Sequence, residues 1–207
     1  MVSNYKQAKK DKKNQPDKGV YTDWKEQIAK ECHYQCVYCA IHENQWGGID
    51  HYHIDHFRPK SHAQFRKLEN DILNLFYSCP VCNRFKSDDW PAEPDLNVIS
   101  YPDPSLVDYN TIFDFDASNY ILIGTNISSN YLIERLFLNR AQLVYERKEE
   151  ALKRKELDLT NEINQLVQKI NDIELAKKTI QVITDVKNHL NKREKIRPYK
   201  LAEIRKK

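Results

Sequence analysis

Four of the five cysteines form two pairs with the same spacing. Cys36 and Cys39 make the first C-x-x-C pair, and Cys79 and Cys82 make the second. With this spacing one loop offers two ligands to a tetrahedral ion, and four thiolates complete the closed shell that is typical of structural zinc. Apolar packing gives no reason for a doubled spacing, and five cysteines do not make an even disulfide framework. The pairs therefore predict a structural Zn²⁺ site, with Cys32 left without an assigned role.

Side chains suited to hydrolysis lie between the two pairs and directly after them. The segment 53–61 reads HIDHFRPKS and contains Asp55 and His56, while Asn74 and Asn83 lie on either side of the second pair. A histidine titrates near neutral pH and can take a proton from water, and carboxylate and amide oxygens suit a hard ion. The 39 residues between the pairs exceed the insert of a simple zinc ribbon, so we expect a folded element there.

Short elements must position these side chains. Within residues 21–40 the spacing of Trp24, Ile28 and Ala29 suits a short helix, with Thr22 as the expected N-cap, that leads into the first cysteine pair. Residues 51–57 are aromatic-rich and strand-like, and Pro59 ends them. Residues 70–77 fit either a helical turn or a strand, and periodicity alone does not decide between the two.

The second half of the chain predicts a hairpin followed by long helices. Residues 111–125 contain IFDF and YILIG, which are β-prone, around the turn residues DASN. After Gly124 there is neither Gly nor Pro until Pro198, and apolar residues recur in heptad-like steps from Leu152 to Ile173. This pattern fits an antiparallel helical hairpin, a dimerising coiled coil, a docking helix for a partner, or a stripe buried within the chain.

Composition describes a polar chain with an uneven charge distribution. Of the 207 residues, 30% are charged and 40% are hydrophobic, and the mean hydropathy is −0.78. Because the sequence contains neither an apolar run of spanning length nor a secretory signal, we expect a cytoplasmic protein without a membrane span. The formal net charge is +3, with lysines crowded in 1–18 and Lys and Arg in 192–207. Such basic ends suit a polyanionic partner, or are simply solvated.

Taken in order, these motifs resemble the HNH endonuclease family. In its zinc-containing members a C-x-x-C pair precedes a strand that ends in an acidic residue and His, an Asn-Leu pair follows, and C-x-x-C-N-x-x-K closes the motif. Residues 55–56, 74–75 and 79–86 match these elements, so the resemblance covers about a quarter of the chain, residues 36–86. Position 83 is Asn where many members have His, a variant that favours a hard, oxygen-preferring ion over zinc at the catalytic site.

The resemblance also implies roles for individual residues. His56 would be the general base, Asp55 and Asn83 would hold one catalytic Mg²⁺ or Mn²⁺, and Asn74 would orient His56 or shape the loop. On a strand His53 shares a face with Asp55, so it is either a further ligand or phosphate contact, or a structural histidine. Four cations flank the site and are expected to contact phosphates: Arg58, Lys60, Arg84 and Lys86.

The sequence thus predicts an α+β protein with a ββα-metal (HNH) core, a structural zinc held by the four paired cysteines, a small β-hairpin and a long, mainly α-helical C-terminal region. The expected parts are a flexible basic arm at 1–19, the nuclease domain at 20–105, a hairpin packing on the core at 106–127 and a helical region at 128–207. The expected activity is metal-dependent hydrolysis of nucleic acid, with DNA favoured. Two alternatives remain open, namely a non-catalytic zinc module that binds nucleic acid or protein, and an RNA-cleaving toxin.

Residues 130–147 carry a looser resemblance to HNH proteins of bacterial anti-phage systems, including the Septu type and some retron cassettes. The resemblance rests on the run Leu138, Asn139, Arg140 and on Arg147. It implies an effector nuclease that acts with an ATPase partner, and the helical region is also compatible with a homodimer.

Overall fold

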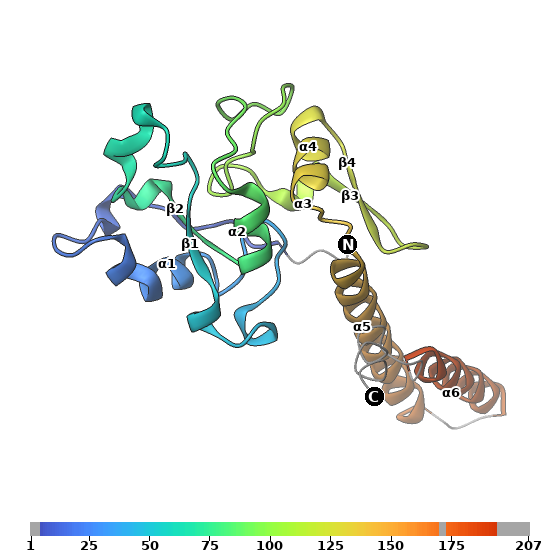
Figure 1. Ribbon diagram of the computed structural model, residues 1–207. Helices are drawn as coiled ribbons and strands as arrows, with labels where there is room; N and C mark the ends of the chain where they lie inside the picture. The colour runs from blue at the N-terminus through green and yellow to red at the C-terminus, as the bar shows by residue number, and fades with distance from the viewer. Residues whose placement is uncertain (1–4, 170–172, 194–207) are drawn as a thin grey trace, which may run out of the picture. The chain divides into compact units, whose positions relative to one another are not determined.

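The computed structural model describes residues 5–169 and 173–193, and the chain divides into two compact units (Figure 1). Unit 1 is Met1–Val144 and unit 2 is Tyr145–Lys207. This division falls after the hairpin and the helix that follows it, later than the predicted boundaries at 105/106 and 127/128. Among the described residues, no helix combines the length and apolar character needed to cross a membrane.

The centre of unit 1 is a strand-strand-helix arrangement. Strand β1 (His53–His56) pairs antiparallel with β2 (Leu75–Ser78), with His53 opposite Ser78 and His56 opposite Leu75. Helix α2 (Pro80–Lys86) follows directly, capped by Cys79 and begun by a proline, whose missing N–H costs nothing at that position. The predicted order of two strands and a helix is therefore confirmed.

Residues 70–77, for which periodicity allowed a helical turn or a strand, contain both. A single 3₁₀ turn, η6 (Ile72–Asn74), is followed without a break by β2. Asp71 caps that turn by accepting a hydrogen bond from the backbone N–H of Leu73 at 3.0 Å. Periodicity failed here because neither element is long enough to repeat its pattern.

The short helix expected within 21–40 is present. It starts as a 3₁₀ turn, η2 (Tyr21–Trp24), and continues as α1 (Lys25–Glu31). Thr22 lies inside η2 and is not its N-cap. Val20 is the N-cap, and its backbone N–H donates to Asp23 Oδ2 at 2.9 Å. Unit 1 contains four further 3₁₀ turns, of which only the last lies between β1 and β2: η1 (Lys12–Asn14), η3 (Glu43–Gln45), η4 (Ile49–His51) and η5 (Ala63–Leu68).

The prediction of a flexible arm at 1–19 is wrong for residues 5–19. Tyr5 and Ala8 are buried, and the backbone N–H of Ala8 donates to the carbonyl of Pro104 at 3.0 Å. The ammonium group of Lys10 lies 2.7 Å from a carboxylate oxygen of Glu31, and both side chains are almost fully buried. Low apolar content was misleading, because two buried side chains and a few long-range polar contacts are enough to attach this segment.

The hairpin expected at 111–125 is present. A short helix, α3 (Tyr109–Ile112), leads into β3 (Phe113–Asp116), which pairs antiparallel with β4 (Ile121–Gly124). Helix α4 (Ile127–Arg135) packs against β4 so closely that a Cβ atom on Gly124 would lie 2.6 Å from the backbone nitrogen of Asn130. Glycine is therefore required at this position, and α4 belongs with the hairpin in unit 1.

The core of unit 1 is rich in tyrosine, and the hydroxyl groups of its buried tyrosines find partners. Tyr52 donates to the carbonyl of Ile41 at 2.8 Å, and Tyr38 donates to a carboxylate oxygen of Asp55 at 2.5 Å. Buried hydroxyls need such partners, because an unpaired one loses its hydrogen bonds to water. The largest fully buried aromatic side chains are Tyr38, Tyr52, Phe57, Phe76, Tyr77 and Tyr101.

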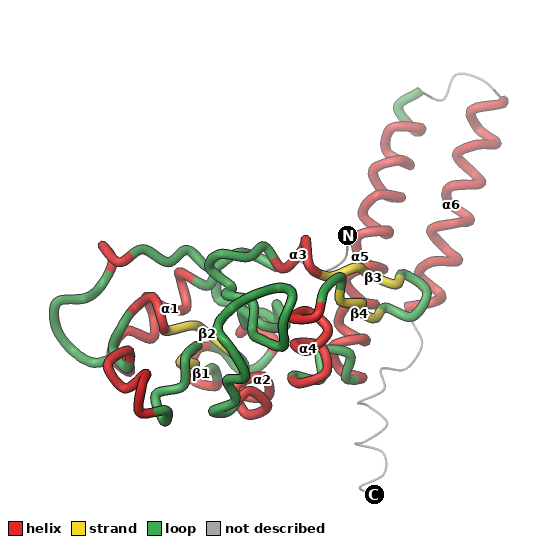
Figure 2. Tube along the Cα trace, turned by 90° about the horizontal axis from the view of Figure 1, so that it is seen from above, coloured by secondary structure: helices red, strands yellow, loops and turns green. Residues whose placement is uncertain are grey.

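Unit 2 contains an antiparallel helical hairpin, one of the predicted alternatives. Helix α5 (Ala141–Val167) begins in unit 1 and continues into unit 2, and α6 (Ile173–Arg193) lies beside it (Figure 2). His189 Nε2 donates to the carbonyl of Leu152, which joins the end of α6 to the first half of α5. Ile170 of the heptad pattern and the basic segment 194–207 lie outside the described residues.

Candidate functional site

The two cysteine pairs come together in unit 1. The Sγ atoms of Cys36, Cys39, Cys79 and Cys82 all lie within 4.8 Å of one another, and all four residues are buried. The first pair lies in a turn that is joined to β2 by a hydrogen bond from the Val37 N–H to the Tyr77 carbonyl, 3.0 Å long. The second pair lies at the start of α2. The cluster can therefore hold a zinc ion, as the spacing predicted.

The chemistry of this donor set suits a cation. Burial raises the pKa of the Cys36 thiol well above its ordinary value. Four thiolates cannot share one buried site without a positive charge, and a tetrahedral Zn²⁺ ion supplies it. Cys32 lies in the core outside the cluster, and burial raises the pKa of its thiol to about 11, so it remains a protonated packing residue.

Arg140 contacts the cluster from the segment that follows α4. Both terminal nitrogens of its guanidinium group lie 3.8 Å from Cys82 Sγ, and one of them also donates to the carbonyl of Leu136 at 3.1 Å. Hydrogen bonds to metal-bound ligands commonly contribute to metal affinity. The motifs predicted no role in the metal site for this arginine, because 58 residues separate it from Cys82.

His56 is held in the protonation state that a general base needs. Its Nε2 atom lies 3.0 Å from the carbonyl oxygen of Glu69. Because a carbonyl only accepts hydrogen bonds, Nε2 carries the ring proton and Nδ1 is left with its lone pair. Burial lowers the pKa of His56 below the ordinary 6.5, so the ring is neutral at pH 7. Nδ1 can then accept a proton.

A network of three residues surrounds the His56 ring. The ring of Tyr21 packs edge-on against it, with 4.7 Å between the centroids. Lys60 Nζ donates to the Tyr21 hydroxyl at 3.0 Å and to a carboxylate oxygen of Glu69 at 2.8 Å. The sequence predicted only a phosphate contact for Lys60, and nothing in the pattern indicated Tyr21 or Glu69, since neither belongs to one of the matching motif elements.

Asp55 has polar partners at both of its carboxylate oxygens. One accepts from the Tyr38 hydroxyl at 2.5 Å, and the other lies 3.1 Å from Lys86 Nζ. Lys86 also donates to the carbonyl of His56 at 2.9 Å and is fully buried. The prediction that Lys86 contacts nucleic acid is therefore wrong. One helical turn after Cys82, it lies on the core face of α2, where Asp55 compensates its charge.

Asp55, His56 and Asn83 line one pocket of about 450 Å³. The Asn83 side chain is partly exposed and makes no hydrogen bond with any residue that the structure describes. Asp88 also lines the pocket and was missed, although the acidic pair directly after the motif was visible in the sequence. The pocket thus brings together a base, two carboxylates and an amide.

Asn74 shapes the loop that follows β1. Its Oδ1 atom accepts from the Arg58 backbone N–H at 2.8 Å, and its Nδ2 atom donates to the carbonyls of Arg58 at 3.1 Å and Leu68 at 3.3 Å. The side chain is almost completely buried. Of the two roles that the resemblance implied, these contacts correspond to loop shaping rather than to a direct contact with His56.

The remaining predicted residues lie at the periphery. Arg58 forms an ion pair of 2.6 Å with Glu93 and stacks over Trp90, 5.5 Å from the ring centroid. Arg84 is exposed on α2. His53 is exposed on β1 and is not among the residues that line the pocket, so the structure does not bring it together with Asn83.

Comparison with known proteins agrees with this architecture. The family model described as HNH endonuclease matches residues 36–89, which include both cysteine pairs, β1, β2 and α2. Neither the curated proteins nor the solved structures gave a significant match to the chain. The similarity to HNH endonucleases is thus confined to residues 36–89, the segment that contains the four clustered cysteines and most of the residues that line the pocket.

Proposed function

We propose that the chain is a metal-dependent endonuclease that hydrolyses phosphodiester bonds, with DNA as the favoured substrate. The observation that carries the proposal is the state of His56. Its Nε2–H group donates a hydrogen bond to the Glu69 carbonyl, and burial lowers the pKa of the ring. His56 also lines the same pocket as Asp55 and Asn83. Burial makes a structural histidine neutral as well, but a structural role does not require the ring to line a pocket together with a carboxylate and an amide.

Asp55 and Asn83 are the residues that would hold a catalytic Mg²⁺ or Mn²⁺ ion. Each Asp55 oxygen accepts one hydrogen bond and so keeps a lone pair, and the Asn83 oxygen has no other partner among the described residues. When bound, the ion would polarise the scissile phosphate and stabilise charge on the leaving oxygen. Because Lys86 already compensates Asp55, we expect weak affinity until a substrate phosphate adds further ligands.

The chain's own residues would activate and orient the nucleophile. His56 Nδ1 takes a proton from a water molecule as the water oxygen bonds to phosphorus. The P–O bond to the leaving sugar oxygen breaks, and that oxygen takes up a proton from solvent. The Glu69 carbonyl and the Tyr21 ring restrict the rotation of the imidazole. The proton then leaves to solvent through the open pocket, because burial disfavours the imidazolium form.

The test is cleavage of plasmid DNA and of RNA with Mg²⁺ by wild type, His56→Ala and His51→Ala. His51 is exposed outside the pocket and serves as the matched control. Loss of a general base is expected to slow cleavage by roughly 100-fold or more, without loss of zinc, whereas His51→Ala should cleave normally. Cleavage by His56→Ala at the wild-type rate would remove His56 from the mechanism. Binding without cleavage would indicate the non-catalytic module, and cleavage of RNA alone would indicate the toxin.

The biological role that we propose is that of an effector nuclease in anti-phage defence, acting with an ATPase partner. The support is the sequence resemblance of residues 130–147. Expression in bacteria together with the neighbouring genes should reduce phage plating, and His56→Ala should abolish that protection. Light scattering of the purified protein distinguishes an ATPase complex from a homodimer.

A further inference from the structure

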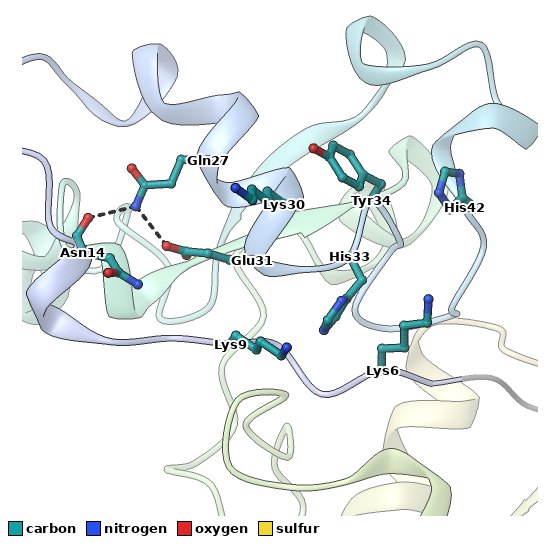
Figure 3. Close-up of a pocket in the computed structure, with 9 residues that line it drawn as sticks. All are labelled: Lys6, Lys9, Asn14, Gln27, Lys30, Glu31, His33, Tyr34 and His42. Carbon is teal, nitrogen blue, oxygen red and sulfur yellow. Dashed lines mark hydrogen bonds between the residues drawn. The ribbon is translucent and has the colours of Figure 1, made fainter.

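A second pocket of unit 1 lies between the N-terminal segment and α1 (Figure 3). It is open to solvent, has a volume of about 810 Å³ and contains none of the residues predicted for the zinc site or the catalytic site. We call it the basic groove. Its cationic and aromatic lining residues are Lys6, Lys9, Lys30, His33, Tyr34 and His42.

The lysines of the basic groove have no acidic partner. Lys6, Lys9 and Lys30 are exposed, and their ammonium groups form no ion pair or hydrogen bond with residues that the structure describes. Glu31 is the one carboxylate in the lining, and its oxygens already bind Lys10 at 2.7 Å and Gln27 at 2.9 Å. The groove therefore keeps three uncompensated positive charges, and its ligand must be anionic.

The distribution of these charges favours an extended anion over a compact one. Lys6 and Lys9 extend from the N-terminal segment and Lys30 from α1 on the other side of the groove (Figure 3). A site for one phosphate group would have fixed, buried donors converging on one point, whereas exposed lysines on flexible stems match a row of phosphates. The rings of Tyr34 and His42, 6.4 Å apart, add flat surfaces against which sugars or bases can lie.

We propose that the basic groove binds the phosphodiester backbone of a nucleic acid strand, without reading its sequence. The identity of the ligand rests on the proposed function, since the strand would be the substrate of the nuclease. Lysine contacts to phosphates position a strand and carry no sequence information. The groove would thus supply affinity that the pocket at His56 does not itself provide.

The test compares two triple variants with the same loss of charge. Lys6→Gln, Lys9→Gln and Lys30→Gln together remove the groove lysines. The control removes three exposed lysines outside both pockets: Lys13→Gln, Lys18→Gln and Lys67→Gln. Both are made in full-length His56→Ala without Mg²⁺, so that binding is measured without cleavage. The readout is fluorescence anisotropy of a labelled duplex of about three helical turns across a series of salt concentrations, with ATP as a compact competitor.

We expect the groove variant to bind roughly 10- to 100-fold more weakly than the control at about 0.1 M salt, with a salt slope that is smaller by roughly 2 to 3. Equal affinity of the two variants, or no binding by the parent protein, would overturn the proposal. Stoichiometric displacement of the duplex by micromolar ATP would also overturn it, in favour of a compact phosphate site. A protein that binds through the groove but never cleaves would contradict only the proposed function.

Discussion

The two compact units fix their side chains by different means. In unit 1 every strand has four residues, and the functional side chains are held by partners far away in sequence, such as Lys86 on Asp55 and Glu69 on His56. In unit 2 two long helices satisfy their own backbones, and only a few described side chains are buried, among them Leu159 and Val182. Backbone hydrogen bonds within each helix are enough to form a helical hairpin. Placing a base beside a pocket also needs side-chain contacts between residues that are distant in sequence.

The sharpest way to test this difference is to remove a zinc ligand. Cys79→Ala should prevent cooperative folding of unit 1, because structural zinc contributes on the order of 10 kcal/mol in small zinc domains, about the whole stability of an ordinary domain. The helices of unit 2 should persist. Zinc content, near-ultraviolet circular dichroism of the tyrosines and far-ultraviolet dichroism of the helices measure the three expectations.

Cys32→Ala is the matched control, because Cys32 is equally buried but outside the cluster. It should retain zinc and lose only about 1 kcal/mol of stability, as expected for a small buried side chain. An unchanged melting temperature of Cys79→Ala would contradict the role of the cluster.

The buried ion pair should give the next largest effect. Lys86→Met leaves the Asp55 carboxylate without a compensating charge in the interior, at a cost of about 3–5 kcal/mol in the free energy of unfolding of unit 1. Urea denaturation followed by tyrosine fluorescence measures it. Arg84→Met, on the exposed face of the same helix, should change the free energy by less than about 0.5 kcal/mol. Similar values for the two variants would show that the pair is not structural.

A single apolar side chain should affect only the helical unit. Leu159→Ala is expected to destabilise unit 2 by about 2 kcal/mol, at the lower end for a buried leucine, because a two-helix hairpin can relax around the gap. Leu157→Ala is the control, since Leu157 is 61% exposed. Hydrogen exchange at the amides of α5 and α6 should speed up in the first variant alone, and faster exchange in unit 1 would contradict the independence of the two units.

The smallest expected effect is a displaced pH profile. Burial lowers the pKa of His56, so its ring stays neutral down to a lower pH than the ring of an ordinary histidine. Because the neutral ring is the base, cleavage should also continue down to that lower pH. As the pH falls through this lowered pKa the ring gains a proton, and the rate should drop with a midpoint below the ordinary 6.5. A midpoint at or above that value in the pH dependence of kcat/KM would mean that another group limits the rate.

The sequence predicted the features that depend on local patterns and missed those that depend on contacts between distant residues. The long helices followed from periodicity, and the cysteine cluster followed from a spacing that places two thiols on one turn. The side-chain partners did not follow. Nothing local indicates that Lys86 turns inward to Asp55 while Lys60 joins Tyr21 to Glu69, because these contacts depend on how distant turns close.

The packed N-terminal segment escaped prediction for a related reason. Its composition is that of a solvated tail, but the burial of Tyr5 and Ala8 and long-range polar contacts, such as the ion pair of Lys10 with Glu31, attach it to unit 1. That attachment also creates the basic groove, which no motif indicates because its lysines come from two separate segments.

The Arg140 contact has a consequence for how the protein would respond to metal loss. A zinc ion with four thiolates carries two surplus negative charges, and one guanidinium group, with two nitrogens 3.8 Å from Cys82 Sγ, offsets part of that surplus. Without the ion the thiols regain their protons, and the arginine is left facing neutral sulfur. Zinc starvation or oxidation of the cluster would therefore also loosen the turn at Leu136, whose carbonyl accepts a hydrogen bond from the same arginine. Loss of the ion would thus change the structure both at the cysteines and at this turn.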